Sequence, residues 1–452
     1  MKNMKYYLKL TFIIGMILVL AACNTQNAVS VPNSTVPEVS SVTTGEEPIT
    51  LKLWHIWVTS SDSNKRPFEK ALKDWNDANP NIQIVTEATE SEAYKIKIRT
   101  AIAVNEAPDI FFGWGAGFAK PFVESGKILA LDEYLTQDTL NSIIPGSLEN
   151  FTYNNKIYAL PTFLIAGIFY CNQELFDKYD VSIPNTFDEL IEVVKVFNNN
   201  KITPMAVGLR DGWPGIFYQN ILAIRTAGVD KCISALNKET SFYQPEFIES
   251  AQKLKELIDA GAFYNGSIQL TQYEAESTFL MGKVPMYYCG SWSAGSMDRE
   301  DCPVKGKVVV KNFPVLTGAT GDNNGFLGGA IDNFMISSAT KHKKEAVSAM
   351  VEICQNLSKE SYLSGAGIPA WYVDVNSNEV SPLSANISEL LSKNDGFVLA
   401  WDTFLTGEDA QTHIDLVSDI YSGKITPEKF AMEMQRLNTS SQDSSIDQQN
   451  NQ

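Results

Sequence analysis

Apolar and polar residues alternate along the first part of the chain in a way that predicts strands and amphipathic helices in turn. Residues 50–57 alternate with a period of two, which is typical of a strand. Residues 67–79 place apolar side chains on one helical face, and their initial proline suits a first helical turn. Strands are also predicted at 82–85 and 109–112, with a second amphipathic helix between them. This order is typical of βαβ units and predicts a largely parallel sheet.

The alternation of strands and helices continues after residue 159 and extends nearly to the end of the chain. A helix is predicted to begin after Thr186, because this residue and Glu189 have the spacing of a capping box. The further predicted elements are a strand at 163–171, a helix at 245–260, a strand at 307–311, an apolar stretch at 331–337, a helix at 341–355 and a last helix capped at 426–428. No internal repeat is found in the sequence, so the pattern predicts an α/β fold.

The N-terminus has the composition of a secretory signal. Three lysines precede an uncharged apolar run over 10–22, which is shorter than the ~20 residues of a membrane-spanning helix. The run ends in Leu-Ala-Ala-Cys, so small residues stand directly before Cys23, an arrangement that resembles a bacterial lipobox. We therefore predict a lipoprotein signal peptide over 1–22 and a diacylated Cys23. The alternative is an ordinary signal peptide followed by a cysteine without this role.

Two polar segments flank the part of the chain with globular composition. Residues 23–48 contain no aromatic side chain and are predicted to form a disordered tether, and 439–452 are predicted to be a disordered tail. No later stretch reaches ~18 uninterrupted apolar residues, so the lipid anchor is the only predicted attachment to a membrane. The roughly 390 residues between these segments exceed what one core usually organises, which predicts two domains or lobes.

Charge and cysteine content narrow the classes of partner and cofactor. A formal net charge of −17 disfavours nucleic acids and anionic membranes as partners. Five cysteines follow Cys23, and this odd number without a close pair does not predict a disulfide framework. The sequence contains no C-x-x-C motif, so we expect buried free thiols and neither a metal nor a cofactor.

Seven short motifs occur in an order that resembles one known family. They are Asn-Pro-Asn-Ile at 79–82, Ala-Pro-Asp-Ile at 107–110, the run from Tyr to Pro at 153–161, Tyr-Cys-Asn at 170–172 before Leu-Phe at 175–176, the capped helix start at 184–190, Phe-Leu-Met-Gly-Lys-Val-Pro-Met at 279–286 leading to Gly-Ser-Trp at 290–292, and Ile-Thr-Pro-Glu at 425–428. In this order the chain resembles the extracellular solute-binding proteins that include maltose- and multiple-sugar-binding proteins. Two positions depart from the family pattern: Cys171 is inserted, and Pro285 stands where the family commonly has alanine. Both are expected to affect packing.

The resemblance implies a two-lobed, periplasmic-binding-protein-like α/β fold that is hinged and has discontinuous lobes. We assign residues 49–160 and 312–355 to the N-terminal lobe, and residues 161–311 and 356–438 to the C-terminal lobe. Members of such a family close their lobes over a ligand by hinge bending. The implied protein is a monomeric lipoprotein on the extracellular face of a Gram-positive-like cell membrane, which delivers a sugar or oligosaccharide to the transmembrane subunits of an ABC permease.

Candidate ligand-binding residues follow from the chemistry of sugars and from the position of strands. Sugars present apolar ring faces and many hydroxyl groups, so they suit flat aromatic side chains beside carboxylates and amides. Pockets in open α/β sheets lie beyond the carboxyl ends of the strands. The candidates near such ends are His55, Trp57, Trp114, Asp211, Trp213, Trp292, Trp401 and Asp402, with Gly329 as a weaker candidate beside Phe163, Trp371 and Gly328.

Each of these residues also has a structural interpretation. A tryptophan at helical spacing, such as Trp75, is expected in the core, and Trp54 is expected there because it alternates with His55. Trp114 lies between glycines and Trp213 between glycine and proline, which favours exposed loops over burial. Asp402 could instead cap the segment that follows it.

Catalytic motifs are sparse in the sequence. It contains three histidines and no H-E-x-x-H, Walker or dinucleotide motif. The number of acidic residues leaves a paired-carboxylate glycosidase open. The leading hypothesis is therefore a binding protein without enzymatic activity, and the alternative is a secreted glycoside hydrolase or a carbohydrate-surface adhesin. A polyamine or metal-ion receptor is a third possibility.

Overall fold

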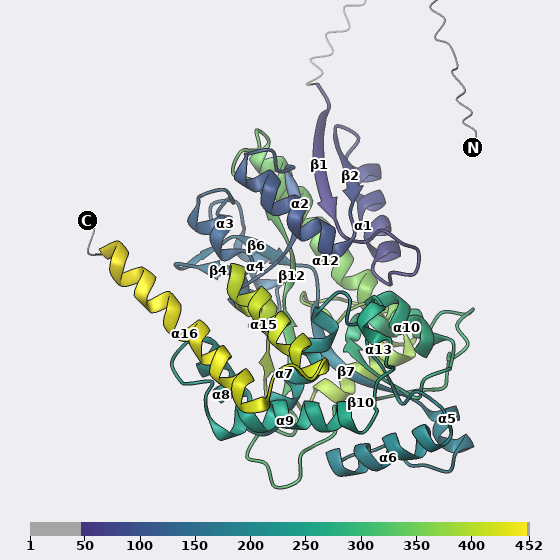
Figure 1. The fold of residues 1–452 in the computed structure, drawn as a ribbon. Coiled ribbons are helices and arrows are strands. Elements are labelled where there is room, and N and C mark those ends of the chain that lie inside the picture. Colours follow the sequence, from purple (N-terminus) through teal and green to yellow (C-terminus); the bar gives the residue numbers. More distant parts are fainter. Residues whose placement is uncertain (1–46, 450–452) are drawn as a thin grey trace, which may run out of the picture. The chain divides into compact units, whose positions relative to one another are not determined.

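The structure is a computed structural model that describes the backbone of residues 47–449 and the side chains up to Asn438 (Figure 1). The predicted signal peptide, Cys23 and nearly all of the predicted tether lie outside the described residues. Within the described range, no helix combines the length and the apolar character that crossing a membrane would require.

A five-stranded sheet organises one half of the described chain. Its strand order is β2-β1-β3-β12-β6, and β1 pairs in parallel with both β2 and β3 as the βαβ pattern predicts. The two remaining strands come from later segments, and β12 is antiparallel to its neighbours β3 and β6. The strands are β1 (Ile49–His55), β2 (Ile82–Ala88), β3 (Ile110–Trp114), β6 (Ala159–Pro161) and β12 (Asp332–Ile336), and the main helices are α1 (Lys65–Ala78), α2 (Ser91–Ala103) and α12 (Lys343–Ser364).

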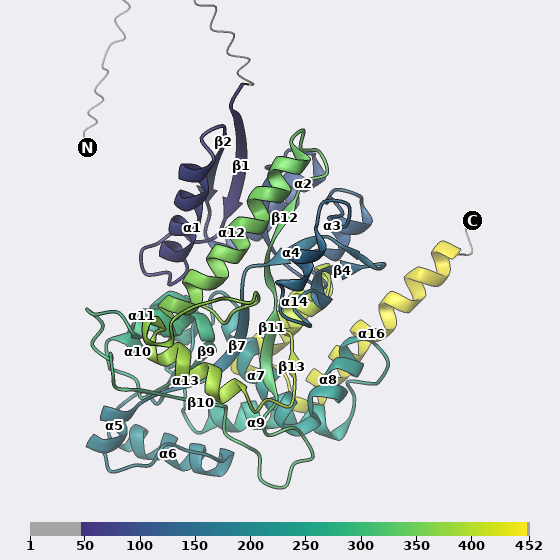
Figure 2. The same ribbon diagram turned by 180° about the vertical axis from the view of Figure 1, so that it is seen from behind.

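A second, mostly antiparallel sheet organises the other half. Its order is β13-β11-β7-β9-β8, and the long strand β7 also pairs with β10. The strands are β7 (Leu164–Asn172), β8 (Met205–Ala206), β9 (Met286–Gly290), β10 (Val308–Lys311), β11 (Phe326–Ala330) and β13 (Phe397–Val398), and the main helices are α7 (Trp213–Ala227), α9 (Pro245–Asp259), α10 (Gln272–Leu280), α14 (Trp401–Phe404), α15 (Gly407–Tyr421) and α16 (Pro427–Gln449). Figure 2 shows α12 beside the first sheet. In the second half, α7 packs against β11 and β9, α9 packs on α7, and α16 packs on α9.

The remaining elements are short connections and peripheral helices. They are α3 (Lys120–Glu124), α4 (Gln137–Asn141), η1 (Glu149–Phe151), β4 (Thr152–Tyr153), β5 (Lys156–Ile157), α5 (Gln173–Lys178), α6 (Phe187–Asn199), α8 (Val229–Leu236), η2 (Ser267–Gln269), η3 (Ser291–Ser293), α11 (Ala294–Met297), η4 (Ser377–Glu379) and α13 (Pro382–Leu391). The predicted capping box of α6 is confirmed, because Thr186 and Glu189 each bind the backbone N–H of the other.

The chain crosses between the two sheets more than once. It leaves β6 for β7 and returns from β11 to β12, and the two crossings are joined where Thr162 N and Oγ1 each donate to Asp332 O at 3.0 Å. Because β11 pairs with β7, residues 326–330 belong to the second sheet although they fall within the segment 312–355 that we assigned to the first lobe. The other lobe limits remain predictions.

Each sheet is covered by its own large apolar cluster. Phe112 and Phe334 are fully buried in the first, and Phe169 and Trp401 are fully buried in the second. The five described cysteines are all buried free thiols, as predicted. Trp75 is buried as predicted.

Two local predictions differ from the structure. Trp54 is only partly buried: its ring packs against the apolar cluster of the first sheet, and Lys97 Nζ lies 3.8 Å from the ring centroid. The tail predicted over 439–452 is helical up to Gln449, since α16 continues through it. The first turns of α16 are anchored in the core by the buried side chains of Phe430 and Met434. Extending a helix that has already formed costs little free energy, so the polar residues that follow continue it.

Candidate functional site

A pocket of about 450 Å³ lies between elements of the two sheets. One wall comes from the ends of β1 and β3 and the start of α2, and the other from α7, α10, η3, α14 and α15. The crossing between β11 and β12 reaches its floor at Ile331 and Asp332. This volume is within the range of ~300–1,000 Å³ that is common for small-molecule sites.

Three aromatic side chains from the second sheet's half form one side of the pocket. The ring of Trp213 lies 6.0 Å from that of Trp292 at an interplanar angle of 60°, and Phe217 lies 6.2 Å from Trp292. Gly212, with φ of 76°, turns the backbone into α7 so that Trp213 starts the helix at the pocket. Gly290 is also required, because a Cβ at that position would come within 1.9 Å of the Trp292 ring.

Aromatic side chains from the first sheet's half face the pocket from the opposite side. Trp114 ends β3 and packs edge-on against Phe112 at 5.1 Å and Phe118 at 5.0 Å. Trp57 also lines the pocket, although only 3 % of its surface is exposed. Rings on both sides can therefore contact the apolar faces of one flat ligand.

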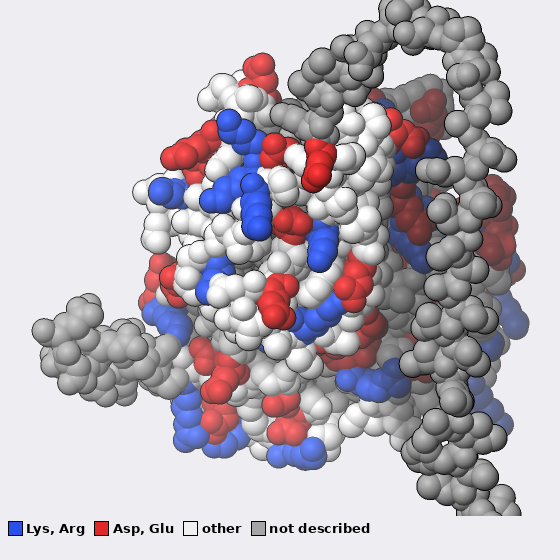
Figure 3. All heavy atoms as spheres, turned by 90° about the horizontal axis from the view of Figure 1, so that it is seen from above, with Lys and Arg blue, Asp and Glu red and all other residues white. Residues whose placement is uncertain are grey.

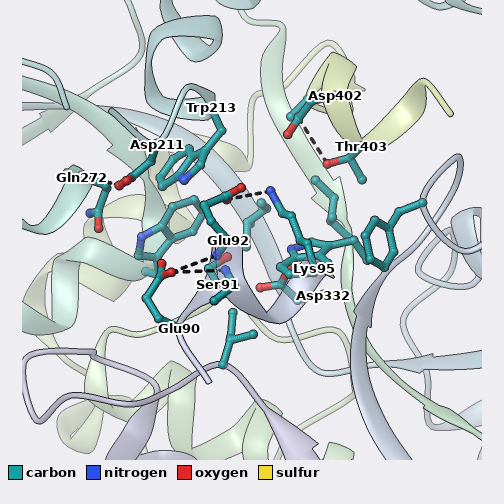
Figure 4. Close-up of a pocket in the computed structure, with 18 of the residues that line it drawn as sticks. Glu90, Ser91, Glu92, Lys95, Asp211, Trp213, Gln272, Asp332, Asp402 and Thr403 are labelled. Carbon is teal, nitrogen blue, oxygen red and sulfur yellow. Dashed lines mark hydrogen bonds and ion pairs between the residues drawn. The ribbon is translucent and has the colours of Figure 1, made fainter. Parts of the chain in front are cut away.

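Two acidic residues at one end of the pocket are fixed by helix starts. Glu90 is the N-cap of α2, and its Oε2 accepts from the backbone N–H groups of Glu92 at 3.1 Å and Ala93 at 3.5 Å. Asp211 Oδ2 accepts from Gln272 N at 2.7 Å, at the start of α10. The close-up shows these two carboxylates near the same end of the pocket (Figure 4). The hydrogen bonds of these two carboxylates to described residues use one oxygen of each.

Asp62 and Glu276 lie deeper in the same region. Asp62 Oδ1 accepts from Asn64 N at 3.0 Å, and its Oδ2 accepts from the hydroxyl of Tyr273 at 3.1 Å. Gln272 Nε2 donates to Glu276 Oε2 at 3.2 Å, whereas Oε1 has no partner among the described residues. Burial raises the pKa of Asp62 to about 6 and that of Glu276 to about 7.

The rest of the pocket combines acidic groups with a lysine. Lys95 Nζ forms an ion pair with Glu92 at 2.8 Å and lies 5.3 Å from the centroid of the Trp114 ring. Asp402 lies across the pocket beside Thr403 (Figure 4), and burial raises its pKa. Burial likewise raises the pKa of Asp332 to about 7.

The predicted site residues fall into two groups in the structure. The pocket lining includes Trp57, Trp114, Asp211, Trp213, Trp292 and Asp402. It does not include His55, Gly329 or Trp401, and it also omits the weaker candidates Phe163, Trp371 and Gly328. The first group is brought together by the fold, and its role in ligand binding remains a prediction.

The residues outside the pocket are placed there by packing. His55 lies 4.4 Å from the Phe68 ring, its Nδ1 accepts from Trp57 N at 3.2 Å, and burial lowers its pKa to about 4. Trp401 is fully buried, 5.1 Å from Phe242, so that only its neighbour Asp402 reaches the pocket.

The remaining candidates are also held in the protein interior. Gly329 lies in β11 opposite Ile165, and a side chain there would meet Leu399 rather than the pocket. A side chain at Gly328 would meet the backbone of the same strand β7. Phe163 and Trp371 are each 1 % exposed, and Trp371 Nε1 donates to Pro161 O at 2.7 Å.

Several polar residues of the pocket were not among the candidates predicted from the sequence. The rule that sites follow strand ends applies equally to residues 61–64 after β1 and 90–95 after β2, so these could have been found. Gln272, Tyr273 and Glu276 lie on a helix, and no sequence pattern indicates that α10 turns this face to the pocket. The missed polar residues are Ser61, Asp62, Ser63, Asn64, Glu90, Ser91, Glu92, Lys95, Arg99, Gln272, Tyr273, Glu276, Ser296, Asp332, Thr403 and Gln411.

We expect the Asp332→Asn variant to be more stable than the parent protein at pH 8, by about 1–3 kcal/mol, with a smaller difference at pH 5. The raised pKa of Asp332 means that the folded state binds more protons than the unfolded state between pH ~4 and ~7. This carboxyl therefore lowers the free energy of unfolding as the pH rises through that window, and asparagine removes the effect. Urea denaturation at pH 5, 6, 7 and 8 measures it.

The exposed substitution Glu106→Gln serves as the control and should give no pH-dependent difference. The buried histidines His55 and His413 titrate in the opposite direction, but they are present in every protein compared and cancel in the differences. A constant difference between Asp332→Asn and the parent across this pH range would contradict the prediction.

Comparison with known proteins identifies the family. A family model described as bacterial extracellular solute-binding protein matches residues 60–351. The chain belongs to this family. Its members are solute-binding proteins and not enzymes, so the alternative of a secreted glycoside hydrolase is not supported.

Individual relatives agree with this family over most of the chain. A multiple sugar-binding protein of Streptococcus mutans is 25 % identical over 393 residues, which cover 84 % of this chain and 86 % of that protein. A maltotriose-binding protein of Pyrococcus abyssi is 28 % identical over 249 residues, covering 54 % of this chain and 50 % of that protein.

Solved structures resemble this extracellular solute-binding protein along nearly their whole length. One, from a study of xylan utilization by the thermophilic bacterium Caldanaerobius polysaccharolyticus, is 42 % identical with a TM-score of 0.83 and covers 86 % of this chain and 99 % of that one. A chitin oligosaccharide binding protein is 25 % identical with a TM-score of 0.79, covering 88 % and 99 %. The predicted two-lobed α/β fold is confirmed by these neighbours.

Proposed function

We propose that this protein is the substrate-binding component of a bacterial ABC importer and that it captures an oligosaccharide in the pocket between the two sheets. The observation that carries the proposal is that one pocket brings together Trp213 and Trp292 from one half, Trp57 and Trp114 from the other, and several carboxyl groups. Rings on both sides suit the apolar faces of a pyranose, and carboxylates suit its hydroxyl groups.

Oligosaccharides with a β-linked backbone are the first ligands to consider. The solved structure at 42 % identity comes from a study of xylan utilization, and a neighbour at 25 % identity is described as a chitin oligosaccharide binding protein. We propose a xylo-oligosaccharide as the ligand. The relatives described as sugar-binding and maltotriose-binding support the broader class of ligand.

We further propose that a diacylated Cys23 anchors the mature protein outside the cell and that it works as a monomer that docks on permease subunits. The lipobox-like sequence before Cys23 supports the anchor. Expression in a bacterium with labelled palmitate tests it: the parent protein should incorporate the label and stay in the membrane fraction, and Cys23→Ala should do neither. Equal labelling of both proteins would contradict the anchor.

The ligand proposal is tested by isothermal titration calorimetry with xylotriose, chitotriose, maltotriose, raffinose and spermidine. We expect xylotriose to bind with Kd at or below about 1 µM, which corresponds to about −8 kcal/mol, and to be recovered unchanged after incubation. Binding of spermidine alone would indicate a polyamine receptor instead. Tight binding of another sugar instead would support the importer function and would identify that sugar, rather than a xylo-oligosaccharide, as the ligand.

A further inference from the structure

The lining of the pocket is strongly unbalanced in charge. Among the described lining residues, seven are acidic and two are basic. The acidic residues are Asp62, Glu90, Glu92, Asp211, Glu276, Asp332 and Asp402, and the basic residues are Lys95 and Arg99. The face of the molecule in Figure 3, by contrast, mixes acidic and basic side chains without a patch of one sign. The imbalance is therefore a property of the pocket that the net charge alone does not explain.

The two basic residues of the lining are already engaged. Lys95 is held by Glu92 at 2.8 Å. Arg99 is exposed, and its guanidinium carbon lies 4.9 Å from the centroid of the Phe118 ring. Glu92 balances the charge of Lys95, whereas Arg99 contacts an aromatic ring and keeps its positive charge.

The opposite end of the pocket has acidic residues and no basic residue in its described lining. Glu90, Asp211, Asp62 and Glu276 gather around α10 there, and Tyr273 is close to three of them. The nearest cations outside this lining are Lys65, Arg299 and Arg210, and they interact electrostatically with Asp62, Glu276 and Asp211 in that order. Lys65 donates to Val58 O at 2.8 Å, Arg299 pairs with Asp301 at 3.2 Å, and Arg210 lies beside Asp211 outside the pocket.

The four carboxyl groups at this end of the pocket offer hydrogen-bond acceptors to a ligand. Glu90 and Asp211 each use one carboxylate oxygen on a helix N-terminus, and Glu276 Oε1 is buried without a partner among the described residues. Hydroxyl groups of a neutral sugar can donate to these oxygens. A carboxylate on the ligand has no hydrogen to donate and adds a like charge, which a partly desolvated pocket screens poorly.

We propose that the acidic end of the pocket, formed by Asp62, Glu90, Asp211 and Glu276, restricts the protein to uncharged oligosaccharides and rejects those that bear a uronic acid. This inference rests on the proposed oligosaccharide-binding function and adds a specificity to it. The selection acts through charge, so it differs from exclusion of a branch by size.

Three matched ligands separate charge from size. Calorimetry at pH 7.5 compares xylotriose, xylotriose bearing a glucuronic acid branch, and the methyl ester of that branched sugar. We expect the acid to bind about tenfold to hundredfold more weakly than the ester at 20 mM salt, and the ratio to shrink at 500 mM salt, where the screening length is short. The ester and the acid differ little in size, so a size filter would weaken both equally.

Two variants assign the effect to named residues. Glu90→Gln and Asp211→Asn keep the shape of each side chain and remove one charge each. Either variant should therefore reduce the ratio of the Kd of the acid to the Kd of the ester severalfold. Glu106→Gln removes an exposed charge outside the pocket and should leave the ratio unchanged. The urea denaturation midpoint of each variant confirms that it is folded.

The outcomes distinguish this inference from the proposed function. If none of the three xylotriose ligands binds while another neutral sugar in the panel does, the neutral, uronic acid and methyl ester ligands are prepared from that sugar and compared in the same way. If no sugar binds, the proposed function fails. If the acid binds as well as the ester, or if both are equally weak, the charge selection is wrong and the oligosaccharide function stands.

Discussion

Replacing Trp292 with alanine is expected to weaken binding of the preferred oligosaccharide by about 2–3 kcal/mol, or about 30- to 150-fold in Kd. The indole packs against the rings of Trp213 and Phe217 on one side of the pocket, so its loss removes a stacking surface and a support of the other two rings. Tryptophans at the centre of a contact commonly dominate its binding energy. Calorimetry with the parent and the variant measures the effect.

The same substitution is also expected to lower stability, which the sequence did not indicate. In the structure Trp292 packs against all three apolar clusters and covers Gly290. Replacing a fully buried tryptophan with alanine costs about 3–5 kcal/mol, so we expect about 1–2 kcal/mol for this partly buried one.

Trp54→Ala is the matched control for the loss of an indole. Trp54 is partly buried like Trp292, but its ring contacts Lys97 and it does not line the pocket. We expect its replacement to leave Kd within about twofold of the parent value, a difference of ~0.4 kcal/mol. An equal loss of affinity in both variants would indicate a general structural effect, and unchanged affinity in Trp292→Ala would remove this residue from the site.

Replacing Arg225 with alanine is expected to reduce the free energy of unfolding by about 3–5 kcal/mol. Arg225 is completely buried near the end of α7, and its guanidinium donates to three backbone carbonyl groups and one amide oxygen. The acceptors are Phe313 O at 3.1 and 3.2 Å, Asp322 O and Gly325 O at 2.9 Å each, and Asn312 Oδ1 at 2.6 Å. Alanine would remove the donors of the three carbonyl oxygens and leave Asn312 Oδ1 with only the N–H of Phe313.

Urea denaturation of three proteins tests this role of Arg225. Arg225→Lys keeps the charge but not the planar fork of donors, so it should recover only part of the lost stability. Arg66→Ala removes an exposed arginine and should change the free energy of unfolding by less than about 0.5 kcal/mol. Full recovery by lysine would show that charge, rather than the set of hydrogen bonds, accounts for the effect.

Local sequence signals were sufficient for much of the secondary structure. The predicted helix at 245–260 is α9, Pro245–Asp259, and the predicted strand at 163–171 is β7, Leu164–Asn172. Both depend on periodicity and on residues that start or stop an element, which act over a few positions. The parallel pairing of β1, β2 and β3 followed from their order for the same reason.

The sequence by itself determined the α/β class, the family and the aromatic character of the site, because these depend on short patterns and residue types. Only the tertiary structure decided which side chain of each neighbouring pair reaches the pocket: Trp57 and Asp402 do, whereas His55 and Trp401 pack in the cores. It also decided that Glu276 of α10 faces the same space as Glu90 of α2. Such contacts join segments far apart in the chain, and the packing of whole helices and sheets, which no local pattern records, sets them.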